Sequence, residues 1–239
     1  MHLRALGLIT VFAAASSACS QAPSPAARFF PFQPGARWTY NFQQSIEGVV
    51  PNVNKIAGSW SDTVSAVERM SSSLQMVAIT RRGTLPQDFG DCQASAATPG
   101  IVDFWYVVQP TRIFVRCTEA DARSLAATLI ASPASPISSG DGPEYVLPFH
   151  VGAFWDNDPD ERRNDGIYRW NVIASGSVSV PAGRFNGCFQ TSYQTMPDDE
   201  ERWVCPGVGL VEQDYDHHGS TNEITIKLTE YHAGSAKSH

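Results

Sequence analysis

The chain has 239 residues, a length typical of one domain or two small ones. Hydrophobic residues make up 42% and charged residues 17%, which supplies enough apolar material for a core and too little charge for a disordered chain. The net charge of -7 argues against nucleic acid as a partner, and the composition also excludes collagen, a coiled coil and a multi-span membrane protein.

Residues 1–18 have the features of a signal peptide. Arg4 supplies a positive charge, and residues 5–15 form an apolar stretch that fits the ~7–15 residues of a signal core and falls short of the ~20 that span a bilayer. Small residues then precede Cys19. This order resembles the lipobox of bacterial lipoproteins, although Ser16 stands where leucine is usual. Cleavage by an ordinary signal peptidase fits the same small residues.

The cysteine count favours lipidation of Cys19. Five cysteines leave one thiol unpaired in an exported protein, whereas removal of Cys19 to a lipid leaves an even set of four. The lipoprotein resemblance implies a membrane partner through a diacylglyceryl and palmitate anchor. Because Ser20 rather than aspartate follows, it implies the outer membrane, facing the periplasm, if the host is Gram-negative. Without the lipid, the protein would be secreted or periplasmic. Residues 19–28 are expected to form a tether.

The other four cysteines are expected to form two disulfides. They are Cys92, Cys117, Cys188 and Cys205. Three pairings are possible. We favour the sequence-local one, Cys92 with Cys117 and Cys188 with Cys205, because the latter two fall on the arms of a predicted hairpin that turns near residues 196–199. Export favours disulfides over zinc, and the chain lacks a C-x-x-C motif, so neither a metal nor a cofactor is expected.

A period of two in hydrophobicity predicts a mainly β fold. The clearest example is residues 223–231, where Ile224, Ile226 and Leu228 alternate with polar residues. Turns containing proline and glycine separate the segments. The expected strands are 36–44, 56–67, 74–82, 101–108, 112–117, 168–173, 185–193, 200–205, 208–215 and 223–231. We therefore predict an antiparallel curved sheet or an incomplete β-barrel.

One helix is predicted, over residues 119–131. Thr118 followed by Asp121 resembles a capping box, and four apolar residues then share one helical face. Residues 29–233 are expected to form a single β domain, with residues 132–147 as a candidate junction between two halves and residues 234–239 as a flexible tail. An internal similarity supports two halves: FPFQPGARW at 30–38 matches LPFHVGAFW at 147–155. We interpret it as a recurring approach to a strand in which tryptophan packs across the sheet; an aromatic ligand platform is the alternative.

Three motifs resemble a loose family of bacterial envelope lipoproteins and secreted proteins of uncharacterised function. The motifs are PFQPGARWTY at 31–40, VPAGRFNGCF at 180–189 and RWVCPGVGLV at 202–211. The family has Pro-Leu-x-x-Gly-x-x-Trp-x-Tyr in the first motif, and Phe32 replaces the leucine here. The resemblance implies an antiparallel β fold, with an incomplete barrel wrapped on a helix as one form of it. It implies no catalytic residue.

The chain contains few patterns of catalytic or metal-binding residues. Residues 156–166 are acidic, but an EF-hand would require glycine and glutamate where Glu161 and Ile167 stand, so a solvated loop is the simpler interpretation. His217 and His218 are adjacent, and neighbouring side chains on a strand point to opposite faces. We therefore expect an exposed turn there. Neither G-x-S-x-G nor H-E-x-x-H is present.

These observations favour a non-enzymatic, lipid-anchored envelope protein whose concave face binds an apolar ligand or an envelope protein. A structural or assembly module with a filled core is the second hypothesis. The third is a secreted hydrolase with a metal-assisted site, which would require convergence of residues from distant parts of the chain. Those candidate residues are His150, Asp156, Asp158, His217 and His218.

Overall fold

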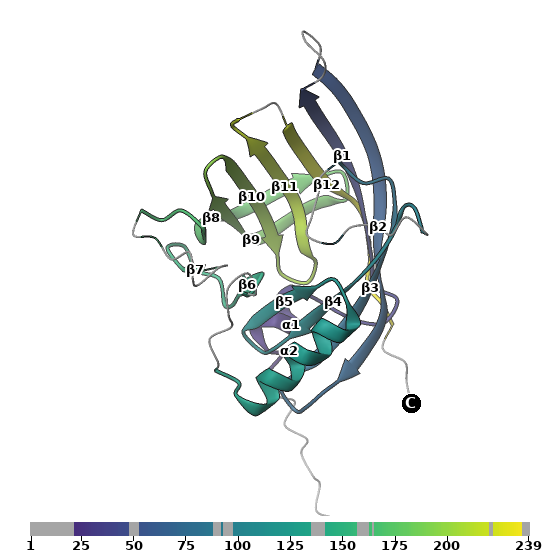
Figure 1. The fold of residues 1–239 in the computed structure, drawn as a ribbon, viewed down its shortest axis with the longest axis vertical. Helices are drawn as coiled ribbons and strands as arrows, with labels where there is room; N and C mark the ends of the chain where they lie inside the picture. The colour runs from purple at the N-terminus through teal and green to yellow at the C-terminus, as the bar shows by residue number, and fades with distance from the viewer. Residues whose placement is uncertain are drawn as a thin grey trace, which may run out of the picture.

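Antiparallel strands dominate the fold, as the sequence predicted. The computed structural model describes residues 22–47, 53–87, 92, 98–134, 142–156, 163, 165–219 and 222–235, and these residues form one twelve-stranded sheet with two helices. The sheet curls into an incomplete barrel (Figure 1). The elements are α1 (Pro25–Phe29), β1 (Arg37–Glu47), β2 (Val53–Arg69), β3 (Gln75–Gly83), β4 (Ile101–Val108), β5 (Arg112–Arg116), α2 (Glu119–Ala131), β6 (Tyr145–Val146), β7 (Phe154–Asp156), β8 (Arg169–Val180), β9 (Gly183–Gln194), β10 (Asp198–Cys205), β11 (Gly209–His217) and β12 (Asn222–His232).

The ten strands expected from the alternating pattern are all present. The structure adds β6 and β7, which have two and three residues and are too short to produce a period of two in the sequence. Helix α2 has the predicted bounds. Its N-cap is Thr118, whose hydroxyl oxygen accepts a hydrogen bond of 3.1 Å from the backbone amide of Asp121.

The sheet consists of two six-stranded meanders placed side by side. Its order is β6-β5-β4-β3-β2-β1-β12-β11-β10-β9-β8-β7, so the first half of the chain forms β1–β6 and the second half forms β7–β12. Antiparallel pairing of β1 with β12 joins the two meanders, and β6 and β7 are the edges. The junction between halves therefore lies between β6 and β7, at and just beyond the region 132–147 that the sequence indicated.

The two similar sequence segments occupy equivalent positions in the two meanders. Phe30–Trp38 leads into β1 and Leu147–Trp155 leads into β7, the first strand of each meander. Both segments turn at a glycine with positive φ, 79° at Gly35 and 89° at Gly152. The Gly35 amide donates a hydrogen bond of 2.9 Å to the Val64 carbonyl on β2. The Gly152 amide donates one of 2.9 Å to the Val172 carbonyl on β8. Both tryptophans are buried.

Helix α2 covers the outer surface of the sheet at β3, β4 and β5, at the lower end in Figure 1. Its buried residues are the apolar set predicted from the sequence: Ala122, Leu125, Ala126 and Leu129. They form a second, smaller core with Met76, Val107 and Phe114, which point outward from the strands. The main core lies inside the barrel, where the opposite faces of the same strands meet.

The predicted tether is partly wrong, because its last residues belong to the folded domain. Residues 25–29 form helix α1, with Ser24 as N-cap and proline at the first helical position. The amide of Ala26 donates to the Pro110 carbonyl at 2.9 Å, and the Arg28 carbonyl accepts from the Gly207 amide at 2.8 Å. Cys19 and the signal peptide lie outside the described residues. No helix of the described chain is long and apolar enough to cross a membrane.

Both predicted disulfides are confirmed. Cys92 bonds to Cys117 and Cys188 bonds to Cys205, with Cα–Cα distances of 5.1 and 4.1 Å. Cys188 and Cys205 lie on the paired strands β9 and β10, the two arms of the expected hairpin, and both are fully buried. Each bridge closes a short loop of the chain, of 25 and 17 residues, which limits the freedom of the unfolded state.

Candidate ligand-binding cavity

The interior of the barrel contains a partly open cavity of about 350 Å³. Its walls come from both meanders, mainly from β1–β4 and from β10–β12. The segment that follows α1 contributes Phe30 and Phe32, which are buried and line the cavity. Gly209 permits this arrangement because a Cβ atom there would approach the Phe30 ring to 2.9 Å. Aromatic side chains are the largest group in the lining and include Trp38, Tyr40, Trp60, Phe104, Tyr106 and Tyr145.

An ion pair lies in the cavity wall on the first meander. Asp62 on β2 and Arg81 on β3 are directly opposite in the strand register. The Arg81 guanidinium donates two hydrogen bonds to the Asp62 carboxylate, at 2.7 and 2.8 Å, and the side chains are only 12% and 17% exposed for Asp62 and Arg81. Burial alone would lower the pKa of Arg81, but Asp62 outweighs that effect and raises it. The Arg81 guanidinium therefore stays charged beside Asp62.

A second charged group lines the cavity and is centred on the second meander. Arg202 on β10 donates to two carboxylates, those of Glu200 on the same strand and Glu144 just before β6. The Glu200 carboxylate also accepts a hydrogen bond of 2.6 Å from the Gln213 side chain. The Arg202 guanidinium stacks on the Trp170 ring at 4.3 Å from its centroid. Burial opposes the charge of Arg202, but its two carboxylate partners raise its pKa well above the usual value.

The cavity tyrosines stay protonated at neutral pH. Burial raises the pKa of Tyr145 to about 12 and raises those of Tyr40 and Tyr106 further. The Tyr40 hydroxyl donates to the Leu210 carbonyl at 3.0 Å. The hydroxyl of Tyr106 has no hydrogen-bond partner within the described part of the chain, so this phenol can donate to a molecule in the cavity.

Two buried polar atoms lie beside Arg202 and have no hydrogen-bond partner among the described residues. They are the indole nitrogen of Trp170 and the hydroxyl of Thr191. Thr191 is opposite Arg202 in the register of β9 and β10, and Trp170 lies under the guanidinium. Buried polar groups are normally paired, so the Arg202 region has hydrogen-bonding capacity that the protein itself leaves unused.

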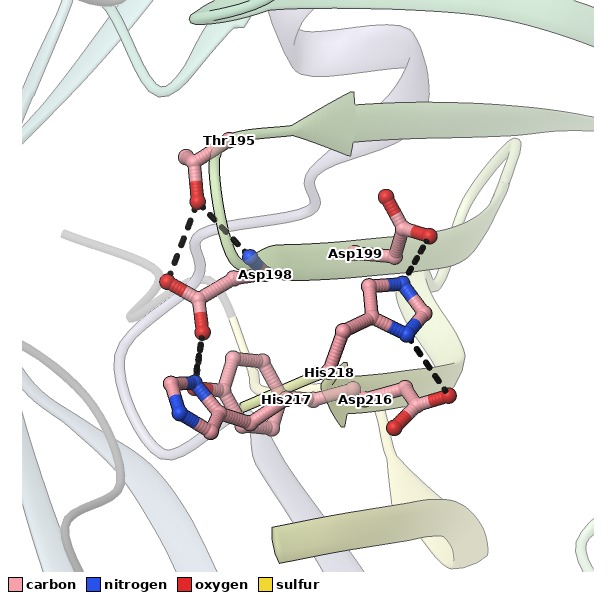
Figure 2. A network of polar contacts seen from close by, with 7 residues as sticks. Thr195, Asp198, Asp199, Asp216, His217 and His218 are labelled. Carbon is pink, nitrogen blue, oxygen red and sulfur yellow. Dashed lines mark hydrogen bonds and ion pairs between the residues drawn. The ribbon is translucent and has the colours of Figure 1, made fainter. Parts of the chain in front are cut away.

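A separate network of acidic and histidine side chains lies at the β10–β11 pair (Figure 2). His217 Nδ1 contacts Asp198 at 2.6 Å, and Asp198 also accepts a hydrogen bond from the Tyr215 hydroxyl at 2.7 Å. Burial alone would raise the pKa of Asp198, but hydrogen bonds from His217, Tyr215 and Thr195 lower it. The carboxylate is thereby held ionised beside the end of β11.

His218 lies between two carboxylates, as Figure 2 shows. Its Nε2 atom is 2.6 Å from Asp199 and its Nδ1 atom is 3.8 Å from Asp216. Asp199 and Asp216 are directly opposite on β10 and β11, an arrangement in which like charges repel. The hydrogen bond with Asp199 raises the pKa of His218. A protonated His218 therefore offsets the repulsion between the two strands.

The four described residues of the hydrolase hypothesis are not brought together as a metal site. His217 and His218 contact different carboxylates, and only His218 is in the expected exposed turn, because His217 is the last residue of β11. His150 is exposed before β7, Asp156 ends β7, and Asp158 lies outside the described residues. Over the described ranges, no group of three His, Cys, Asp or Glu side chains has the geometry of a metal site.

Sequence reasoning did not identify the charged residues of the cavity. The alternating pattern does contain a signal for two of them. Arg81 is on the same inward-facing side of β3 as Val77 and Ile79, and Arg202 is on the same inward-facing side of β10 as Val204. A charged residue at an apolar position of an alternating strand indicates a polar group inside a barrel. Glu144 could not be found in this way, because it lies outside any regular strand.

No protein-family model matches the chain, and no curated protein is significantly similar to it. Solved structures with a related shape include a candidate lipoprotein from Parabacteroides distasonis, at 18% identity and a TM-score of 0.48, covering 89% of this chain and 100% of the other. A candidate exported protein with a YmcC-like fold from Bacteroides fragilis has 12% identity and a TM-score of 0.45, covering 85% and 98% of the two chains. A DUF1329 family protein from Desulfovibrio piger has 10% identity and a TM-score of 0.25, covering 88% and 92%. At these scores we draw no conclusion about function from the likenesses.

Proposed function

We propose that this protein is an exported, lipid-anchored envelope protein that binds an apolar small molecule inside its barrel and catalyses no reaction. The observation that carries the proposal is the aromatic-walled cavity of about 350 Å³. Small-molecule sites have volumes of ~300–1,000 Å³ and walls that are mostly apolar, with a few polar groups that orient the ligand. Asp62, Arg81 and Arg202 are such polar groups.

Export is supported by the cysteines. The two disulfides use all four cysteines beyond Cys19, and disulfides persist in oxidising compartments such as the periplasm or the extracellular space. Cys19 is thereby the odd thiol, at the position where a lipobox would end. We propose that Cys19 carries the lipid and that the membrane is the outer membrane if the host is Gram-negative.

The alternative of a structural module required a core filled by side chains. The cavity argues against that hypothesis, because the side chains on the inward faces of the strands leave this volume empty instead of interdigitating to fill it. A binding function uses the same walls. An envelope protein as partner remains the second candidate, favoured by the sheet edges at β6 and β7, where backbone groups can pair with another chain.

The anchor is tested by expressing the full chain and Cys19→Ala in a bacterial host and measuring intact masses in membrane and soluble fractions. The proposal predicts a membrane-bound species that begins at Cys19 with added diacylglyceryl and acyl mass, and a soluble Cys19→Ala protein. A wild-type protein recovered without lipid in the soluble fraction would refute the anchor.

The cavity is tested with the neutral apolar dye N-phenyl-1-naphthylamine. We expect saturable binding to the wild type, weakened at least about tenfold by Val115→Phe, which places a larger side chain on the cavity wall. Ile173→Phe is the matched control, because Ile173 is 46% exposed on β8 and does not line the cavity. Equal binding by both variants, each folded by circular dichroism, would exclude the cavity as the site.

A further inference from the structure

Several hydrogen-bond donors of the cavity wall are already used by the protein itself. The Trp38 indole and the Tyr40 hydroxyl donate to backbone carbonyls of the second meander, at 2.6 and 3.0 Å. The Tyr215 hydroxyl and the Gln213 side-chain amide donate to carboxylates, at 2.7 and 2.6 Å. These four donors are therefore not available to a bound molecule.

The Tyr106 hydroxyl differs from these donors, because it forms no hydrogen bond with any described residue. Tyr106 faces the interior from the same side of β4 as Phe104, and it is only partly buried where it lines the cavity. Its ring is held by neighbours: it stacks on Phe32 with 4.9 Å between centroids and meets Phe104 edge to face at 5.5 Å. The packing thus presents a fixed phenol to the cavity.

A second phenol proton is available in the same region. The Tyr145 hydroxyl oxygen accepts a hydrogen bond of 3.5 Å from Arg202, but its own proton has no acceptor among the described residues. After burial, Tyr145 is the largest electrostatic influence on the pKa of Tyr106, so the two hydroxyls lie near each other. Burial raises both pKa values, that of Tyr145 to about 12, and both groups remain donors at neutral pH.

A bound molecule changes the surroundings of these two hydroxyls. In the partly open cavity water can accept their protons, but an apolar molecule that fills the cavity displaces that water. A hydrocarbon would leave both donors unpaired, which is unfavourable because a buried donor without an acceptor loses its hydration and gains nothing in return. A carbonyl oxygen has two lone pairs and can accept from both phenols, and it brings no charge away from water.

We propose that the molecule bound in the cavity is an uncharged ketone, ester or amide with an apolar chain, and that the Tyr106 and Tyr145 hydroxyls donate to its carbonyl oxygen. The inference deepens the proposed function and rests on it. It assigns Tyr106 as the residue that distinguishes a carbonyl compound from a hydrocarbon of the same shape. The apolar chain lies against the aromatic side chains of Phe32, Trp38 and Phe104.

The test compares 2-octanone with 2-methyl-1-octene, which have the same shape and differ only in the replacement of the carbonyl oxygen by a CH₂ group. Each is titrated to displace N-phenyl-1-naphthylamine from the wild type and from Tyr106→Phe, which lacks only the hydroxyl oxygen. We expect Tyr106→Phe to weaken 2-octanone binding by about three- to tenfold and to leave 2-methyl-1-octene binding unchanged or tighter. An equal loss for both ligands, or no loss for 2-octanone, would overturn the inference.

Tyr231→Phe is the matched control, because it removes the same atom from a tyrosine on β12 that does not line the cavity. It should leave both affinities unchanged.

A measurement on the wild type alone requires no variant to fold. The infrared carbonyl stretch of bound 2-octanone should lie at a lower frequency than in hexane, because a hydrogen bond weakens the C=O bond, and it should return toward the hexane value in Tyr106→Phe. A hexane-like frequency in the wild type would overturn the inference while the proposed function stands. Failure of the dye and of both ligands to bind would instead refute the proposed function.

Discussion

The strongest stability prediction concerns the ion pair between Asp62 and Arg81. The pair is bidentate and largely buried, and the guanidinium lies 5.4 Å from the centroid of the Trp60 ring and 5.0 Å from that of Phe104. Replacing Asp62 by leucine leaves the Arg81 charge in an aromatic wall without its bidentate carboxylate. Breaking one side of a buried pair costs ~3–5 kcal/mol, and the residual exposure of 12% and 17% places our expectation at the lower end, about 3 kcal/mol.

The double variant separates the charge effect from the loss of packing. Asp62→Leu combined with Arg81→Met removes both charges and keeps similar volumes, so we expect its stability to return to within about 1 kcal/mol of the wild type. The free energies of unfolding are measured by urea denaturation of the wild type, both single variants and the double variant, with the m-value as a check on two-state behaviour.

An exposed ion pair provides the control. Arg123 and Glu68 form a 2.8 Å contact with side chains that are 46% and 52% exposed, so Glu68→Gln should cost ~0–1 kcal/mol. The reasoning is refuted if Asp62→Leu costs no more than this control, or if the double variant is as unstable as the sum of the single ones. Either result would mean that water reaches the pair and that the cavity wall is not a low-dielectric environment.

Three further predictions concern a disulfide, a core side chain and a titrating histidine. Replacing both Cys188 and Cys205 by alanine should lower the free energy of unfolding by about 3 kcal/mol for a closed loop of 17 residues, and an unchanged urea midpoint would contradict this. Leu129→Ala should lower the free energy of unfolding by ~2–5 kcal/mol, whereas Ile130→Ala, at an exposed position, should lower it by less than ~1 kcal/mol. Equal losses of stability would mean that α2 does not pack on the sheet. The pKa of His218 should exceed its usual 6.5 and fall in Asp199→Asn, measured by NMR titration. Because that pKa is raised on folding, its stabilising contribution is present below pH 6.5 and lost as the pH rises through the raised value; an unperturbed titration would contradict the network.

The local elements could be predicted because each rests on neighbouring residues. The alternation of Ile224, Ile226 and Leu228 identifies β12, and Thr118 followed by an apolar helical face identifies α2, since period and capping act within a few residues. The two disulfides could be paired because Cys188 and Cys205 were expected on the arms of one hairpin. Helix α1 is not among the predicted elements although Ser24 and Pro25 are a helix-start signal, because a segment of five residues is too short to show a helical period.

The antiparallel β class, the helix over 119–131 and the two disulfides follow from the sequence by itself, because each depends on a short-range pattern or on the cysteine count. The export signal stays a prediction from the sequence, since residues 1–18 lie outside the described residues. Only the tertiary structure decided that the sheet joins two meanders through β1 and β12 and surrounds a partly open cavity, since β1 and β12 are distant in the chain. It also decided which charges meet there. Glu144 reaches Arg202 only because the curled sheet brings the segment before β6 against β10, a contact between residues 58 positions apart that no local pattern records.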